Sequence, residues 1–212
     1  MFNLQVAWAR PIKLSSQLSE HILRVRILPL ENQTTTKQEP QTLPLQLAIA
    51  LDTSASMQGE KWEKAKAACQ SLVAQLRPCD RLSIAGFADW VTPLAKNLPS
   101  VELGNLPTIL NTLVAEGVTR TDLALNWIHS TLSSETIQTK VGILITDGYP
   151  TSQQGDVLEN FESLILQAEN MAAQGMMLCT VGLGDAADFN SGLLVSLSDR
   201  GKGTFIYADQ PI

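Results

Sequence analysis

Three apolar runs stand out along the chain, and each one stops at or next to an acidic residue. Their length and continuous apolarity are typical of strands buried on both faces, because a strand with one wet face alternates apolar and polar residues. The first run ends at Asp52, the second at Asp147, and the third at Gly184-Asp185. The three predicted strands are 45–51, 141–146 and 177–183.

Segments with helical periodicity separate these strands. In Lys61–Leu76 the apolar residues recur near helical spacing, and Pro78 ends the pattern. Strands that alternate with helices indicate βαβ units. We therefore expect an α/β fold with a doubly wound, mostly parallel central sheet flanked by helices. The other predicted helices are a short one within 99–115 and longer ones over 122–132, 156–174 and 189–198.

The remaining strand signals predict an antiparallel component and an N-terminal extension. Arg81–Ala88 and Trp90–Ala95 are expected to form a hairpin that turns at Asp89. Within residues 1–42 the segment 20–30 alternates Leu, Val and Ile with Arg, which favours an edge strand, and a polar loop follows. We assign 1–42 to this extension and 43–212 to the main domain, with a last strand at 204–208.

Composition narrows the classes of partner. The chain has 212 residues, of which 44% are hydrophobic, and this is enough for a core without disulfide or zinc support. A net charge of −6 argues against nucleic acid or an anionic membrane as the main partner. The N-terminus lacks the features of a secretory leader, and no stretch is typical of a membrane span. These observations lead us to expect a cytoplasmic protein without membrane insertion.

Chemistry is concentrated directly after the first apolar run. Asp52, Ser54 and Ser56 place three oxygen-bearing side chains at alternating positions of one short loop. Ligands of open α/β sheets bind at the carboxyl ends of the strands, where this loop is predicted to lie. Mg²⁺ prefers oxygen ligands, keeps several waters and takes few carboxylates. The pattern therefore predicts a site for a small, hard cation.

Two further motifs complete a recognisable set. Thr119 lies in the loop GVTRT at 117–121, and Asp147 precedes a glycine after the second apolar run. With Asp52-x-Ser54-x-Ser56 they resemble the three parts of the metal-ion-dependent adhesion site of von Willebrand factor type A (VWA) domains, whose fold is Rossmann-like. The resemblance extends over 43–209.

The resemblance implies a role for each residue. It implies that Ser54 and Ser56 bind the metal directly, Thr119 directly or through water, and Asp52 and Asp147 mostly through water. Neutral hydroxyls leave the cation electrophilic, so an open position accepts an Asp or Glu carboxylate from a partner protein. The expected ion is Mg²⁺, with Mn²⁺ or Ca²⁺ as alternatives, and it acts as a bridge and not as a catalyst. We therefore expect a protein-binding adaptor or scaffold and not an enzyme.

The chain departs from the family pattern at two positions and leaves one ligand open. Ala55 and Val118 stand where relatives often have glycine, and neither would contribute a ligand atom. Thr121 competes with Thr119 for the threonine position, because some relatives place the ligand before Asp-Leu. We favour Thr119 because of the preceding Gly117 and the Thr-x-Thr spacing.

The same residues admit other interpretations. The loop after Asp52 could cap itself without binding a metal, which would make the domain a metal-free structural module. A phosphatase of the haloacid-dehalogenase type is disfavoured because Ser54 stands where its second Asp is required. A dinucleotide fingerprint at 182–187 comes too late in the chain. Family resemblance also suggests a non-catalytic subunit of an AAA+ ATPase assembly, MoxR-like or chelatase-like, as found in bacteria.

The tryptophans are expected to be mainly packing residues. Trp62 and Trp127 lie within predicted helices, where apolar side chains face the sheet. Trp90 follows Asp89 in the predicted turn, so an exposed position near a binding face is the alternative for this residue.

Overall fold

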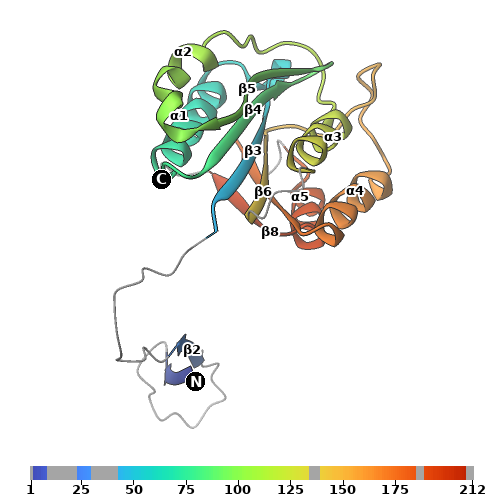
Figure 1. The fold of residues 1–212 in the computed structure, drawn as a ribbon. Coiled ribbons are helices and arrows are strands. Elements are labelled where there is room, and N and C mark those ends of the chain that lie inside the picture. Colours follow the sequence, from blue (N-terminus) through green and yellow to red (C-terminus); the bar gives the residue numbers. More distant parts are fainter. Residues whose placement is uncertain (1, 9–22, 30–42, 134–138, 185–188, 209–212) are drawn as a thin grey trace. The chain divides into compact units, whose positions relative to one another are not determined.

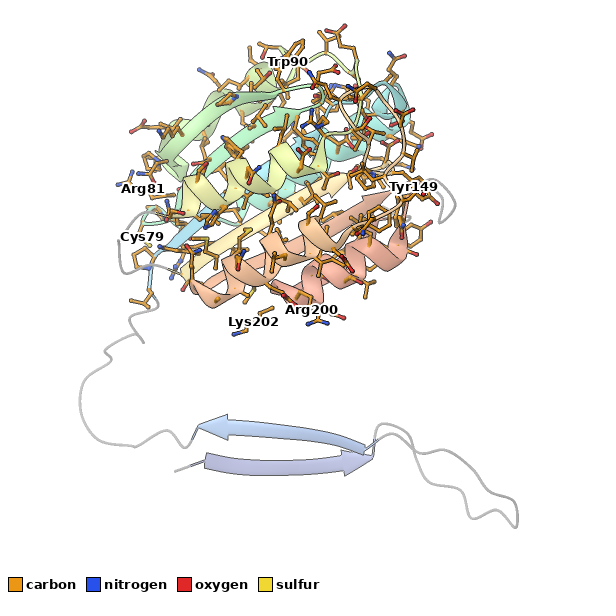
Figure 2. The ribbon with its side chains drawn as sticks, turned by 90° about the vertical axis from the view of Figure 1, so that its right-hand side faces the viewer. Cys79, Arg81, Trp90, Tyr149, Arg200 and Lys202 are labelled. Carbon is orange, nitrogen blue, oxygen red and sulfur yellow. The ribbon has the colours of Figure 1, made fainter. Side chains whose placement is uncertain are left out.

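The computed structural model describes residues 2–8, 23–29, 43–133, 139–184 and 189–208. The chain divides into two compact units, Met1–Gln41 and Thr42–Ile212. In the first unit β1 (Phe2–Trp8) pairs antiparallel with β2 (Leu23–Pro29) in a two-stranded sheet (Figure 2). The polar loop expected after 30 lies outside the described residues, and so do positions 185–187 of the dinucleotide-like pattern at 182–187.

A six-stranded sheet forms the centre of the second unit, in the order β5-β4-β3-β6-β7-β8 (Figure 1). Four of its five strand pairs are parallel, and the β4–β5 pair is antiparallel. The predicted fold class is thereby confirmed. The strands are β3 (Leu45–Asp52), β4 (Arg81–Phe87), β5 (Val91–Pro99), β6 (Thr139–Thr146), β7 (Met176–Leu183) and β8 (Lys202–Ala208).

Helices cover both faces of this sheet (Figure 1). The helices are η1 (Ala55–Met57), α1 (Glu60–Ala74), η2 (Ser100–Asn105), α2 (Leu106–Leu110), α3 (Thr121–Leu132), α4 (Glu162–Ala173) and α5 (Ser191–Arg200). Alternate residues of β3 pack on opposite faces: Leu47 and Ile49 belong to one core cluster with α1 and α2, whereas Ala48 and Ala50 belong to the other with α3, α4 and α5.

Two details differ from the sequence-based expectation. The strand predicted at 20–30 exists as β2, but it pairs with β1 and is not part of the six-stranded sheet, whose antiparallel edge strand is β5. The helix predicted from 156 begins at Glu162, because Asn160 accepts a hydrogen bond from the Glu162 amide in a local turn. Its C-terminal end is as predicted, since Gly175 has a positive φ of 77°.

The cysteines and the helix lengths add no further functional feature to the described residues. Cys69, Cys79 and Cys179 are free, and burial raises the pKa of the Cys69 thiol to about 12. Within the described ranges, no helix has both the length and the apolar character that crossing a bilayer requires.

Candidate metal centre

The candidate residues converge at the carboxyl ends of two adjacent central strands. β3 and β6 run parallel with Leu51 opposite Ile145, so Asp52 ends β3 beside the end of β6. Asp147 follows β6 immediately, and both aspartates are buried. Parallel pairing thus brings together two acids that are 95 positions apart in the chain.

A chain of hydrogen bonds joins the two serines to the second aspartate. The hydroxyl oxygens of Ser54 and Ser56 lie 3.0 Å apart. The Ser56 hydroxyl donates to Oδ1 of Asp147 at 2.8 Å. Three of the predicted site residues therefore form one connected cluster of oxygen atoms.

Asp52 is hydrogen-bonded to the backbone of the serine loop and to the end of β6, and so stabilises the loop conformation. Its Oδ1 accepts from the Ser54 amide at 2.8 Å, and its Oδ2 accepts from the Thr146 hydroxyl. Desolvation by burial raises the pKa of the Asp52 carboxyl to about 6, although both hydrogen bonds oppose the shift. The negative charge of Asp147 adds to the increase. A cation at this place would relieve that electrostatic cost.

Thr119 is placed next to the serine cluster across Gly148. A Cβ atom added to Gly148 would lie 3.1 Å from the Thr119 Oγ1 and 3.6 Å from the Ser56 Oγ. Two bonds with Thr151 hold the loop, since the Thr119 amide donates to the Thr151 hydroxyl and the Thr119 carbonyl accepts from the Thr151 amide. Thr121 begins α3 two residues later and is also buried. The choice of Thr119 over Thr121 as a ligand stays a prediction.

Lys61 is a member of the cluster that the sequence did not reveal. Its Nζ lies 2.8 Å from Oδ2 of Asp147, whose side chain is fully buried, while the Lys61 side chain is 28% exposed. The residue belongs to the first turn of α1, which directly follows the serine loop. The sequence shows a lysine in the turn after the serine loop. Whether its side chain points toward Asp147 depends on how α1 packs, which the sequence does not show.

The serine side chains do not cap the helices that follow the loop. Ser54 is the N-cap of η1, yet its side chain makes no capping hydrogen bond, and α1 begins after Gly59. The serine hydroxyls bond to each other and to Asp147 instead.

The two departures from the family pattern are accommodated. Ala55 is exposed in η1, and neither it nor Val118 is among the residues with positive φ. No glycine is needed at either position.

The donor set determines which cations could fit. Within the part of the chain that the structure describes, no group of three or more His, Cys, Asp or Glu side chains could hold a metal. The cluster instead combines two buried carboxylates with hydroxyls, and the Lys61 ammonium already contacts one carboxylate. Such oxygen-only sets suit hard cations such as Mg²⁺ or Mn²⁺ and not soft ones. The residues present therefore fit a divalent cation of this type.

Comparison with known proteins places this geometry in context. Residues 46–210 match the family model described as von Willebrand factor type A domain. The chain is 27% identical over 171 residues to the uncharacterized protein sll0103 of Synechocystis, covering 80% of this chain and 39% of that protein. It is 25% identical over 174 residues to the human inter-alpha-trypsin inhibitor heavy chain H1, covering 77% of this chain and 19% of the relative. The chain thus spans well under half of either relative.

Solved structures share the fold at low sequence identity. A von Willebrand factor type A protein from Catenulispora acidiphila has a TM-score of 0.68 at 15% identity, covering 99% of this chain and 46% of that one. Manganese-loaded TRAP protein of Plasmodium vivax has a TM-score of 0.63 at 19% identity, covering 78% and 68%. Proximal thread matrix protein 1 of the mussel byssus, solved with zinc in its metal-ion-dependent adhesion site (MIDAS) motif, has a TM-score of 0.63 at 15% identity. The match covers 79% of this chain and 42% of that one.

Proposed function

The chain belongs to the von Willebrand factor type A family, a family of protein-interaction modules, and from this premise we propose that it binds a protein partner through a divalent cation. The cation would be held by the hydroxyls of Ser54, Ser56 and Thr119, with Asp52 and Asp147 stabilising it mainly through water. Bound there, it would supply a positive centre for an Asp or Glu carboxylate of the partner. The module would have no catalytic activity of its own.

The observation that carries the proposal is the connected cluster of oxygen atoms at the ends of β3 and β6. Ser54, Ser56 and Asp147 are linked by distances of 3.0 and 2.8 Å, and Asp52 lies buried behind them. A buried carboxylate is stable as an anion only with a compensating positive charge; the Lys61 ammonium supplies one to Asp147, and a divalent cation would supply it to both Asp52 and Asp147. The manganese-loaded and zinc-occupied relatives support the choice of a divalent ion.

Each residue of the chain has a separate task in this proposal. Asp52 shapes the loop by accepting the Ser54 amide, which directs the serine hydroxyls to one place. Asp147 orients the Ser56 hydroxyl, so that its oxygen lone pairs are available to a cation. Neutral hydroxyls in direct contact leave most of the ion's charge uncompensated. That residual charge is what would attract the partner's carboxylate.

The direct test uses a peptide that carries one acidic side chain, acetyl-Gly-Glu-Gly-amide, titrated into the full chain and followed by NMR. We expect shifts of signals from 53–56 and 117–119 in Mg²⁺ but not in EDTA. The matched peptide with Gln in place of Glu controls for contacts other than the carboxylate. Equal binding in EDTA, or equal binding of the Gln peptide, would contradict the proposal. A metal-free structural module would show no shifts with either peptide, in Mg²⁺ or in EDTA.

Replacing Lys61 by Met is expected to tighten Mg²⁺ binding about tenfold, or ~1.4 kcal/mol. The Lys61 ammonium contacts Asp147, so its positive charge competes with a cation for the same carboxylate. Calorimetric titration of Mg²⁺ measures the effect. Lys64→Met is the matched control, because Lys64 pairs with the exposed Glu60 one turn along α1. Weaker binding in K61M would mean that Lys61 supports the site and does not compete with the ion.

The two threonine candidates are separated by isosteric substitutions. Thr119→Val is expected to weaken Mg²⁺ binding at least tenfold, because it removes a hydroxyl that lies, like the Ser56 hydroxyl, against Gly148. Thr121→Val should change the affinity less than twofold, since Thr121 begins α3. Calorimetry gives both affinities, and circular dichroism confirms that each variant is folded. The reverse pattern would assign the ligand to Thr121.

A further inference from the structure

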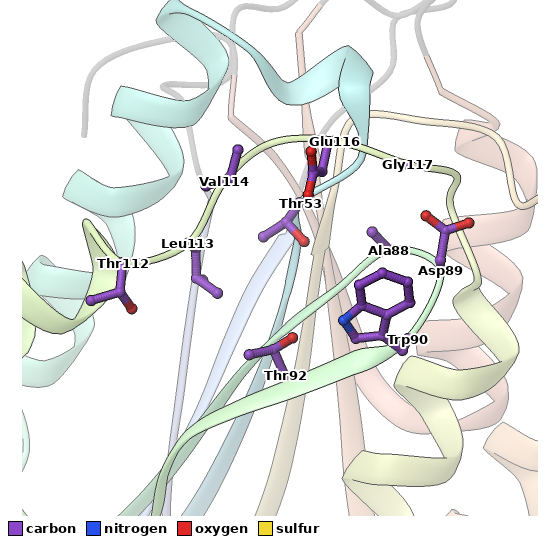
Figure 3. Close-up of a pocket in the computed structure, with 10 residues that line it drawn as sticks. All are labelled: Thr53, Ala88, Asp89, Trp90, Thr92, Thr112, Leu113, Val114, Glu116 and Gly117. Atoms are coloured by element: carbon purple, nitrogen blue, oxygen red, sulfur yellow. The ribbon is translucent and has the colours of Figure 1, made fainter.

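A hollow of about 430 Å³ opens beside the candidate metal centre (Figure 3). It lies between the β4–β5 turn, which carries Asp89 and Trp90, and the segment 112–117 that leads toward α3. Its volume falls within the range of pockets that enclose small ligands, about 300–1,000 Å³. A single side chain of a partner would fit into such a space.

Backbone hydrogen bonds join this hollow to the metal loop. Thr53, which lines it, stands between Asp52 and Ser54. The Thr53 carbonyl accepts from the Glu116 amide at 2.8 Å, and the Ala55 amide donates to the Gly117 carbonyl at 3.1 Å. One wall of the hollow is therefore attached directly to the loop that would hold the cation. A partner that reaches one site is within reach of the other.

The hollow carries negative charge. Asp89 and Glu116 both line it, and neither forms an ion pair with another described residue. Arg120 is close enough for the Asp89 charge to act on it, but its guanidinium donates hydrogen bonds of 2.9 and 2.8 Å to Asp122. The two carboxylates thus offer acceptor oxygens that a cationic ligand could use.

Apolar and aromatic surface accompanies the two carboxylates. Trp90 is 66% exposed and Val114 is 67% exposed; Figure 2 labels Trp90 on the main domain. Leu113 packs over Gly86, where an added Cβ would meet the leucine at 2.9 Å. The exposed position of Trp90 corresponds to the less favoured of the two sequence-based alternatives. An exposed indole face next to carboxylates is suited to a cation, and the apolar walls suit its methylene stem.

We propose that this hollow binds a cationic side chain, an arginine or lysine, of a partner protein. An apolar occupant would cover Asp89 and Glu116 without pairing them, which is unfavourable, and an acidic occupant would be repelled. The partner segment would place this arginine or lysine in the hollow and a neighbouring Asp or Glu carboxylate at the metal. The contact of the carboxylate with the metal rests on the proposed function, whereas binding of the cationic side chain by the hollow does not.

The test is an NMR titration of the full chain in EDTA, with acetyl-Gly-Arg-Gly-amide as the probe. The peptide with norleucine in place of arginine keeps the apolar stem and removes the charge. We expect the arginine peptide to shift the Trp90 indole signal, assigned from the Trp90→Ala spectrum, and to bind at least fivefold more tightly than the norleucine peptide. Asp89→Asn combined with Glu116→Gln should weaken it at least tenfold. Glu102→Gln removes an exposed carboxylate in η2, outside the hollow, and as the control it should have no effect.

Equal binding of the norleucine peptide would overturn the proposal in favour of an apolar occupant. Arginine binding that is unchanged in the double variant, or absent in the wild type, would also overturn it. Repeating the titration in Mg²⁺ with acetyl-Gly-Glu-Gly-amide separates the two proposals. If only the arginine peptide binds, the hollow is supported and the metal function fails; if only the glutamate peptide binds, the reverse holds. Peptides with both residues, separated by zero to three glycines, should bind more tightly in Mg²⁺ than either single-residue peptide.

Discussion

Replacing Asp52 by Ala is expected to abolish the stabilisation of the fold by Mg²⁺. At a Mg²⁺ concentration of 100 times its dissociation constant, the wild type should gain about 2.7 kcal/mol. For a domain of this size that corresponds to a rise in Tm of about 5–10 °C. Asp52 is buried behind the serine loop and accepts the Ser54 amide, so its loss removes both charge and loop geometry. Thermal unfolding in EDTA and in Mg²⁺ measures the difference.

Asp52→Asn serves as the shape-matched control for this experiment. It should also lose the response to Mg²⁺, but in EDTA at pH 7 it should be at least as stable as the wild type. The reason is that burial raises the pKa of the Asp52 carboxyl to about 6, so ionisation at neutral pH opposes folding when no cation compensates it. An undiminished Mg²⁺ response in either variant would contradict the assignment of Asp52 to the metal centre.

Replacing Asp80 by Asn is expected to lower the free energy of unfolding by about 3 kcal/mol while preserving the metal response. The buried Asp80 carboxylate accepts from the Leu45 amide, the Arg77 amide and the Arg77 guanidinium. These bonds tie the beginning of β3 to the loop before β4. Leu45 and Asp52 are at opposite ends of β3, about 23 Å apart at 3.3 Å per residue, so the metal centre should be unaffected.

The same group predicts a pH dependence. Hydrogen bonds from Arg77 lower the pKa of Asp80 to about 2, below the unfolded value of 3.8. The unfolded chain therefore takes up the proton first, and about 2 kcal/mol of stability should be lost as the pH falls from about 4 to 2. Urea unfolding of the wild type and of D80N measures this, and D80N should lack that component.

Glu169→Gln is the control for the loss of an ion pair. It removes the exposed pair of Glu169 with Arg200, and a change below 1 kcal/mol is expected. If D80N were no more destabilised than E169Q, the role assigned to Asp80 would be wrong.

The central part of this fold could be predicted because its signals are local. The apolar runs became β3, β6 and β7, since a strand covered on both faces must be apolar throughout. Asp52 and Asp147 could be placed near each other because parallel strands end at the same edge of the sheet. The hairpin at Asp89 is also present as β4 and β5. In each case a short segment carries the whole pattern.

What the sequence did not reveal depends on contacts between distant segments. The contact of Lys61 with Asp147 requires the packing direction of α1 relative to β6, and no spacing rule provides it. The sequence pattern predicted the edge strand that became β2 but not its partner β1, because alternation shows that a strand exists but not what it pairs with. The hollow is built from three separated segments, so only Trp90 gave a hint of it.

The hydroxyl–carboxylate cluster is expected to bind one divalent cation per chain. Titration of the full chain with Mn²⁺, with the free ion followed by electron paramagnetic resonance, tests it most directly. We expect one Mn²⁺ bound per wild-type chain, displaced by excess Mg²⁺, and none bound at the same concentrations by Asp52→Ala. Absence of stoichiometric binding in the folded wild type, or equal binding in the variant, would contradict the claim.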